Sequence, residues 1–258
     1  MFVFDILIPG TWLDYDDRDW AWNIQNQLES LKDQFFQANV ALNLFNSVSS
    51  IQPAFSKAGD GLSDFLQRSE IQRVVEKEHE GFSSDEIEFE TKVRFNREKW
   101  TSGRVPREFE HVLPFIYART FVYALDAFGK FLEVLGKEAN VPEKIVELHE
   151  QFVADFPYLR GVRNTAQHLE DRARGLGAGK APKPLDLQPI TNNIINAPDG
   201  GVLVLGNLNG SRYGSTMSDG HYGEIDVSLK SMRSLQKILL EVIQSFKWHG
   251  PKEHAPSG

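Results

Sequence analysis

The feature that most constrains this fold is the segment from Arg107 to Lys137, the most apolar helical pattern of the chain. Its apolar residues recur at spacings that place them on two sides of a helix, and Pro114 lies either near the start of that helix or at a kink. A helix that is apolar on two sides must be covered by neighbouring elements. The sequence therefore predicts a helical protein built around this segment as its central helix.

Further helices are predicted on both sides of the central one from repeated apolar positions and from start and stop signals. Pro53 and the Gly59–Gly61 cluster break the chain after the first of them. Ser83 and Glu86 match a capping box, and Ser228 can cap the last helix. The expected helices are residues 14–47, 63–79, 84–100, 143–153 and 229–248.

Between Leu187 and Ser228 the pattern changes to short strand-like runs separated by Gly, Asn, Asp and Ser. The expected strands are residues 190–195, 202–208, 212–217 and 221–227. This pattern predicts a small antiparallel meander. We therefore expect a mainly α fold over residues 1–258, a single helical domain whose bundle carries a β-rich insertion at residues 187–228, before the C-terminal helix.

Composition excludes several kinds of protein. The chain has no Cys, so disulfides, thiolate nucleophiles and Cys-based zinc sites are ruled out. Its longest apolar run, residues 112–125, contains Arg119 and is too short to span a bilayer, which needs about 20 residues. The N-terminal run from Phe2 to Ile8 lacks the basic leader of an export signal, and we expect it to be extended. These features predict a cytoplasmic protein that does not enter a membrane.

Residues 155–175 concentrate the polar chemistry of the chain. Asp155 can cap a helix, Pro157 is tolerated in its first turn, and an apolar stripe continues to a stop at Gly175 or Gly177. A single amphipathic helix is therefore expected here. One polar flank of this helix is formed by Arg160, Asn164, His168 and Asp171. The other flank is formed by Arg163, Gln167, Glu170 and Arg174.

The same segment reverses the charge of the protein. Residues 160–184 contain six basic and two acidic residues, a net charge of +4, in a chain whose net charge is −8. The overall charge argues against non-specific binding to nucleic acid, whereas the local charge suits a phosphate group. We expect phosphate to be bound by Arg160, Arg172 and Arg174.

Arg163 and Asn164 followed by three residues and then His168 resemble the signature motif of the HEPN superfamily (higher eukaryotes and prokaryotes nucleotide-binding). Members are compact helical bundles and are often metal-independent ribonucleases. The resemblance implies that Arg163 and His168 converge on a scissile phosphate, with Asn164 assisting, in a cleft commonly shared by two subunits. It thus implies RNA or a nucleotide as ligand, a homodimer, and no metal or other cofactor.

The chemistry of these residue types suits phosphodiester cleavage. A His exchanges protons near neutral pH, and an Arg stabilises the negative charge that grows on phosphorus. Residues five apart on an ideal helix point about 140° away from each other. Arg163 and His168 therefore need either a distorted first turn near Gly161 or a partner subunit to complete one site.

Two other interpretations remain open. The basic segment can be a solvated helix face with ion pairs to neighbouring helices, in a non-catalytic module that binds a nucleotide, RNA or a protein. Alternatively, two Glu-x-x-His pairs have the spacing of metal-binding carboxylate bundles. These pairs are Glu76 with His79 and Glu108 with His111.

Overall fold

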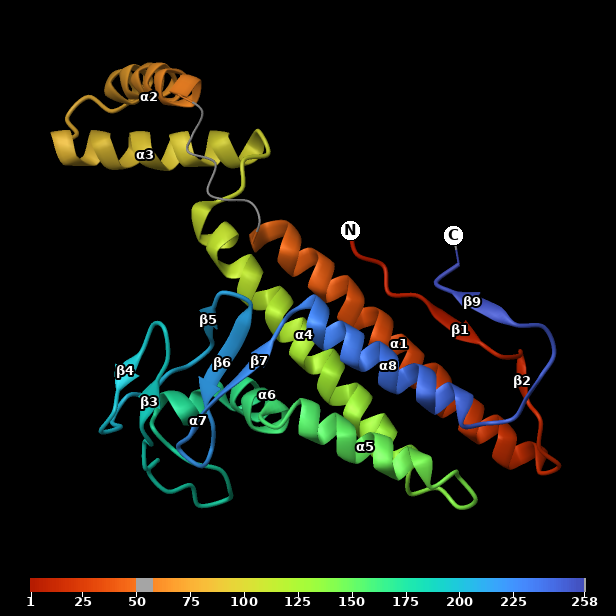
Figure 1. Cartoon of the computed structure of the whole chain (residues 1–258). Coiled ribbons are helices and arrows are strands. Elements are labelled where there is room, and N and C mark those ends of the chain that lie inside the picture. The colour runs from red at the N-terminus through yellow and green to blue at the C-terminus, as the bar shows by residue number, and fades with distance from the viewer. Residues whose placement is uncertain (50–57, 258) are drawn as a thin grey trace. The chain divides into compact units, whose positions relative to one another are not determined.

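The computed structural model describes residues 1–49 and 58–257 (Figure 1). The chain is mainly α with a few short antiparallel strand pairs, as the sequence predicts. It divides into two compact units: the first unit comprises residues 1–46 and 115–258, and the second unit residues 47–114. The predicted break at Pro53 lies outside the described residues.

The first unit is organised by three long helices with apolar faces. They are α1 (Arg18–Ser49), α4 (Arg107–Leu135) and α8 (Leu229–Gln244). Fully buried residues of all three, such as Phe35, Phe128 and Leu239, belong to one hydrophobic cluster. The expected central helix is confirmed as a helix with the predicted start at Arg107. None of the described helices combines the length and apolar content needed to cross a membrane.

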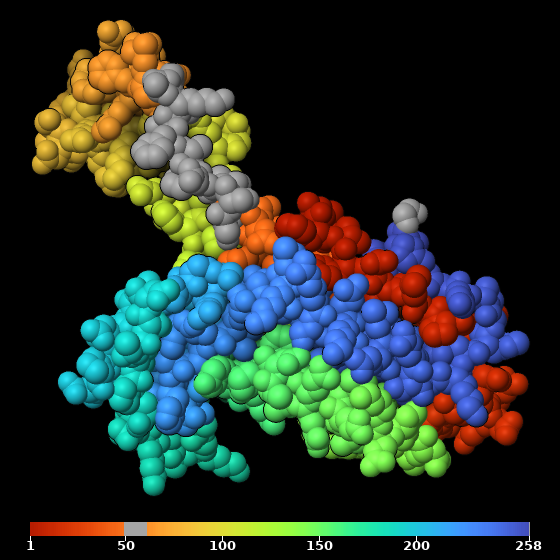
Figure 2. Space-filling view, in the orientation of Figure 1, coloured from red at the N-terminus to blue at the C-terminus, as the bar shows by residue number. Residues whose placement is uncertain are grey.

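The two ends of the chain are joined by short antiparallel ladders. Strand β1 (Ile6–Ile8) pairs with β9 (Glu253–Ala255), and β2 (Trp12–Leu13) pairs with β8 (Trp248–His249). The N-terminal and C-terminal segments therefore lie next to each other on the surface, coloured red and dark blue in Figure 2. The predicted extended conformation of the N-terminal run is confirmed. Helix α8 ends four residues earlier than expected, because Trp248 pairs with β2.

The β-rich segment precedes α8, as predicted. Strands β3 (Ile190–Thr191) and β4 (Asn196–Ala197) form one ladder. Strands β5 (Asn207–Asn209), β6 (Arg212–Thr216) and β7 (Tyr222–Asp226) form an antiparallel sheet in that order. Only the last two residues of the expected 202–208 strand, together with Asn209, are in β5. Gly210 adopts φ +61° in the Asn209-Gly210 turn between β5 and β6.

In the second unit, α2 (Ala58–Glu78) and α3 (Ser84–Thr101) lie side by side as a helical hairpin (Figure 1). The predicted capping box at the start of α3 is confirmed. The Ser83 side chain accepts a hydrogen bond from the Glu86 backbone at 3.4 Å, and the Ser83 backbone donates to the Glu86 carboxylate at 2.8 Å.

Candidate functional site

The segment around the motif folds as three consecutive helices. They are α5 (Lys144–Asp155), α6 (Leu159–Gln167) and α7 (Leu169–Ala173). The expectation that Asp155 caps the motif helix is wrong, because Asp155 is the last residue of α5 and its carboxylate accepts a hydrogen bond from Ser234. Pro157 disfavours the α conformation at Phe156, which adopts φ −129° and ψ +58° and ends α5.

The expectation of one continuous helix to Gly175 is also wrong, because the helix breaks at His168. The backbone of His168 still donates to Asn164 at 3.0 Å, but its φ of −119° and ψ of +45° leave the helical region. Neither Pro nor Gly stands at this position, so no local sequence signal marks the break. The break places His168 at the junction of α6 and α7.

Arg163 lies on the buried side of α6, with only 9% of its surface exposed. Its Nε atom is 2.8 Å from a carboxylate oxygen of Asp126 on α4, and its Nη1 atom donates to Gln167. The Nε–H does not point at the Asp126 oxygen, so this contact is an ion pair without a good hydrogen bond. Asp126 also pairs with Lys130 at 2.8 Å. The charge of Arg163 is therefore balanced inside the first unit.

Two of the predicted phosphate ligands, Arg172 in α7 and Arg174 directly after it, differ in exposure. Arg172 is buried, and its Nη1 atom donates to the backbone carbonyls of Leu176 and, at 2.7 Å, of Gly177. It thereby holds the loop that follows α7. Arg174 is exposed and pairs with Asp171. Of these two side chains, only that of Arg174 reaches solvent.

The exposed side of α6 carries Arg160, Asn164 and His168 in successive turns. Residues four apart lie on one side of a helix, and the hydrogen bond from His168 to Asn164 keeps His168 in that phase. Arg160 is exposed and makes no ion pair within residues 1–49 and 58–257. The side chain of His168 is 59% exposed. The structure brings these three residues to one surface and separates Arg163 from it.

The β-rich segment packs on α6 without covering this surface. Thr165 is buried and donates to the backbone carbonyl of Thr216 in β6 at 3.0 Å. A side chain at Gly161 would collide with Met217, which follows β6. The motif helix is therefore fixed from one side by β6 and its neighbours, and Arg160 and His168 stay open to solvent.

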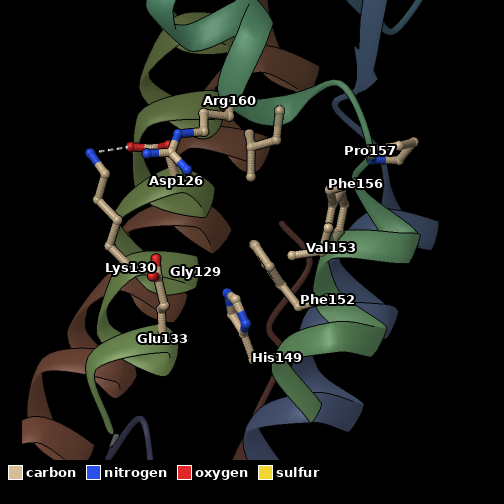
Figure 3. Close-up of a pocket in the computed structure, with 11 residues that line it drawn as sticks. Asp126, Gly129, Lys130, Glu133, His149, Phe152, Val153, Phe156, Pro157 and Arg160 are labelled. Carbon is tan, nitrogen blue, oxygen red and sulfur yellow. Dashed lines mark ion pairs between the residues drawn. The ribbon is translucent and has the colours of Figure 1, made fainter. Parts of the chain in front are cut away.

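A pocket of about 380 Å³ lies beside the start of α6, between α4 and α5 (Figure 3). Phe152 and Phe156 provide aromatic surface, with ring centroids 5.1 Å apart. Gly129 of α4 also lines the pocket, and any side chain there would collide with the ring of Phe152. Polar and charged side chains also line the pocket, together with Val153, Pro157 and Leu159: they are Asp126, Lys130, Glu133, His149 and Arg160.

The neighbours of Glu133 in this pocket lower the pKa of its carboxyl group. A hydrogen bond from Lys137 lowers the pKa of Glu133 below its usual value, and the charges of His149 and Arg160 lower it further. Of the polar residues that line this pocket, the sequence analysis singled out Arg160 alone and did not identify Asp126, Lys130, Glu133 or His149. Asp126, Lys130 and Glu133 follow one another at steps of four and three on the most apolar helix, and that pattern was the available signal.

Neither of the two Glu-x-x-His pairs belongs to a cluster of three possible metal ligands within the described residues. His79 stacks on Phe82 at 4.4 Å and lies beside Arg94, and His111 accepts a hydrogen bond from Arg107. Within the described residues, three ligand atoms come within 4.8 Å of one another only at His168, Glu170 and Asp171. Because this group is exposed and Asp171 already pairs with an Arg, it has the ordinary character of a charged surface.

Comparison of the chain with protein-family models, with curated proteins and with solved structures gave no match.

Proposed function

We propose that the exposed side of α6 and the adjoining pocket form an RNA-binding site of the HEPN kind, and that His168 takes part in metal-independent cleavage there. The observation that carries the proposal is the alignment of Arg160, Asn164 and His168 on an open surface. An acidic protein that concentrates basic residues at one place has a local site for phosphate.

The pocket supports a single-stranded ligand in particular. Proteins that read single-stranded RNA hold unstacked bases against aromatic side chains and hydrogen-bond their edges. Phe152 and Phe156 supply the aromatic surface, and Glu133 supplies an acceptor. Arg160 lines the same pocket and belongs to the exposed side of α6, so a base in the pocket brings its phosphate toward Asn164 and His168.

In the proposed reaction, the neutral imidazole of His168 takes the proton of the ribose 2′-OH. The 2′-oxygen attacks phosphorus, the bond from phosphorus to the 5′-oxygen breaks, and that oxygen leaves with a proton from a second acid. Arg160 stabilises the charge on the phosphoryl oxygens. The second acid is His168 of a second subunit, and the products are a 2′,3′-cyclic phosphate and a 5′-hydroxyl.

A non-catalytic RNA- or nucleotide-binding module is the second candidate function. The observation that favours it is the ion pair between Arg163 and Asp126, because a buried Arg whose charge is balanced does not stabilise a phosphorane-like transition state. In that case the same surface binds the ligand and releases it unchanged.

Substitution of His168 separates the two candidates. We expect the purified protein to cleave single-stranded RNA in the presence of a chelator, and His168→Ala to lose that cleavage while it retains RNA binding by fluorescence anisotropy. His221→Ala is a matched control, since the His221 side chain is 62% exposed and, like His168, lies beside an acidic residue.

The results of the binding and cleavage assays distinguish the two candidate functions. Binding that Arg160→Gln weakens, without cleavage by any variant, supports the non-catalytic module. If the wild type neither binds nor cleaves RNA, or if His168→Ala and His221→Ala cleave equally well, the proposed ribonuclease is wrong.

A further inference from the structure

We propose that the pocket beside α6 selects guanine, so that the site binds guanosine nucleotides and single-stranded RNA is cut on the 3′ side of guanosine. The inference rests on the proposed function for placing a base in this pocket, and it names the base. The residues that read guanine are Glu133 of α4 and His149 of α5, which project from opposite sides of the pocket (Figure 3). The pocket thereby gives the site a base preference that the motif residues do not supply.

Glu133 supplies the pocket with acceptor sites that its own chain leaves open. The Lys137 ammonium donates to one carboxylate oxygen at 2.5 Å and holds the pKa of Glu133 below its usual value, so the side chain is a carboxylate at neutral pH. The other oxygen accepts no hydrogen bond from residues 1–49 and 58–257. A carboxylate has about four lone-pair sites and no donor. Glu133 therefore has room for two donors from a ligand.

The other carboxylate of the pocket, that of Asp126, does not compete for those donors. It pairs with Arg163 and with Lys130, each at 2.8 Å, so its charge is already balanced. The side chain of Asp126 is 11% exposed, whereas that of Glu133 is 40% exposed. The carboxylate that an entering ligand meets is therefore that of Glu133.

Guanine is the RNA base that best satisfies a carboxylate. Its Watson–Crick edge carries two adjacent donors, N1–H and the 2-amino group, which match the two oxygens of one carboxylate as an Arg guanidinium does. Adenine and cytosine have one donor group beside an acceptor on this edge, and uracil has one N–H between two carbonyls. Each of those bases turns a lone pair toward Glu133. A site built to accept two hydrogen bonds rejects a base that cannot donate both.

His149 meets the remaining polar edge of guanine. Its side chain is half-buried in the pocket wall and makes no hydrogen bond with the described residues. A neutral imidazole has one ring N–H to donate, and O6 and N7 of guanine are adjacent acceptors. Because Glu133 and His149 project from different helices into one pocket, adjacent edges of a single flat base meet both side chains (Figure 3).

The rest of the pocket suits a flat, largely apolar body. Phe152, Phe156, Val153 and Leu159 line it, and its volume is about 380 Å³. A cavity of about 150 Å³ already accommodates a benzene ring, so the pocket has room for a two-ring purine. Arg160 lies on the α6 side of the pocket, where its guanidinium is available to the 3′-phosphate of the bound nucleotide.

Guanosine 3′-monophosphate tests the inference without a cleavage step. We expect isothermal titration calorimetry of the full chain to show that it binds at least about 10-fold more tightly than inosine 3′-monophosphate, which lacks only the 2-amino group. The adenosine, cytidine and uridine 3′-monophosphates should bind at least about 100-fold more weakly than the guanosine nucleotide.

Glu133→Gln tests the acceptor. It should weaken binding of guanosine 3′-monophosphate about 10-fold or more and reduce the preference for guanosine over inosine to below about 3-fold. Glu147→Gln is the matched control, since Glu147 also accepts a hydrogen bond from a Lys, Lys144, but lies outside the pocket. The control should leave both the affinity and the preference unchanged, and circular dichroism should show that both variants keep their helices.

His149→Ala tests the other edge of the base. It should weaken binding of the guanosine and inosine nucleotides by the same factor, about 5-fold or more, because both bases carry O6 and N7. The preference for guanosine over inosine should stay as in the wild type. A general disturbance of the pocket would not separate the effects of Glu133→Gln and His149→Ala in this way.

These measurements separate guanine selection from ribonuclease activity. Selective binding of guanosine 3′-monophosphate without RNA cleavage supports the inference and contradicts the ribonuclease. RNA cleavage together with equal affinity for all the nucleotides contradicts the inference and leaves the ribonuclease standing. The inference is overturned if guanosine 3′-monophosphate does not bind up to about 1 mM. A preference for guanosine that Glu133→Gln leaves intact overturns it as well.

Discussion

Helix α8 of the first unit and helix α3 of the second unit distribute their apolar residues in opposite ways. In α8, Leu235, Ile238 and Leu239 are fully buried in the hydrophobic cluster. In α3, Phe89 and Trp100 are exposed, while Arg94 and Thr91 face the neighbouring helix. The first arrangement follows the usual rule for an amphipathic helix, and the second reverses it.

The two units therefore draw their stability from different interactions. Complete burial of one Leu contributes about 1.5–3 kcal/mol, whereas an ion pair open to solvent contributes about 0–1 kcal/mol. The helix packing of the first unit rests on the burial of apolar side chains, which is the stronger of these two contributions. The hairpin of the second unit buries few apolar side chains, among them Ile71 and Val75, and rests more on ion pairs.

The largest effect is expected for Leu239→Ala in α8. Removal of this fully buried side chain leaves a cavity and should lower the free energy of unfolding by about 2–5 kcal/mol. Leu66→Ala is the matched change in the hairpin, where the side chain is exposed, and should stay within about 0.5 kcal/mol of the wild type. Urea unfolding followed by circular dichroism measures both. Equal losses would contradict the contrast between the units.

A smaller loss is expected for Arg163→Met in α6. Among the described residues, the substitution leaves Asp126 in a largely buried position with Lys130 as its one remaining ionic partner, and it should destabilise the first unit by about 1–3 kcal/mol. Arg160→Met is the control, since Arg160 is exposed and should be nearly neutral for stability. Urea unfolding measures the loss. A variant at position 163 that kept full stability but lost RNA cleavage would show that Arg163 acts at the phosphate instead.

The exposure of the four Arg residues near the motif shows how far the sequence can predict a site. These residues are Arg160, Arg163, Arg172 and Arg174. Periodicity and capping signals located α4, α8, the capping box of α3 and the β-rich insertion, because these depend on neighbours within a few residues. Whether an Arg side chain is exposed depends on residues that are distant from it in the sequence. Arg163 is buried by Asp126, which stands 37 residues earlier, and Arg172 by the carbonyls of a loop that folds back on it.

Neither the break at His168 nor the reversed polarity of α3 could be predicted from neighbouring residues in the sequence, and the reason is the same for both. His168 follows an uninterrupted apolar stripe, so only the packing of the folded chain ends α6 there. The sequence of α3 is charged on most faces, so it does not indicate which face meets α2. Contacts between distant segments decide both features, and a single sequence does not record them.

A loss of about 1 kcal/mol is expected for Ser83→Ala at the start of α3. The change removes the side-chain acceptor of the capping box, so the first turn should fray and its amide protons should exchange faster. Ser84→Ala is the adjacent control, because Ser84 lies inside the helix and accepts no capping bond. Hydrogen exchange at the amides of residues 85–88 distinguishes the two variants. Equal exchange in both would mean that the cap contributes nothing to the hairpin.

The smallest effect is expected at Asp64, where α2 meets α3 through charge. Hydrogen bonding to Lys99 lowers the pKa of Asp64, so its contribution to stability is present above the ordinary pKa of Asp, about 4, and is lost as the pH falls through the lowered value. Asp64→Asn should remove this part of the pH dependence at a cost below about 1 kcal/mol. Hydrogen exchange of α2 and α3 between pH 6 and pH 3 measures the difference from the wild type. If the hairpin of the variant loosens in acid as much as that of the wild type, this ion pair does not hold the helices together. The burial of apolar residues such as Ile71 and Val75 would then account for their packing, and the contrast with α8 would be one of degree only.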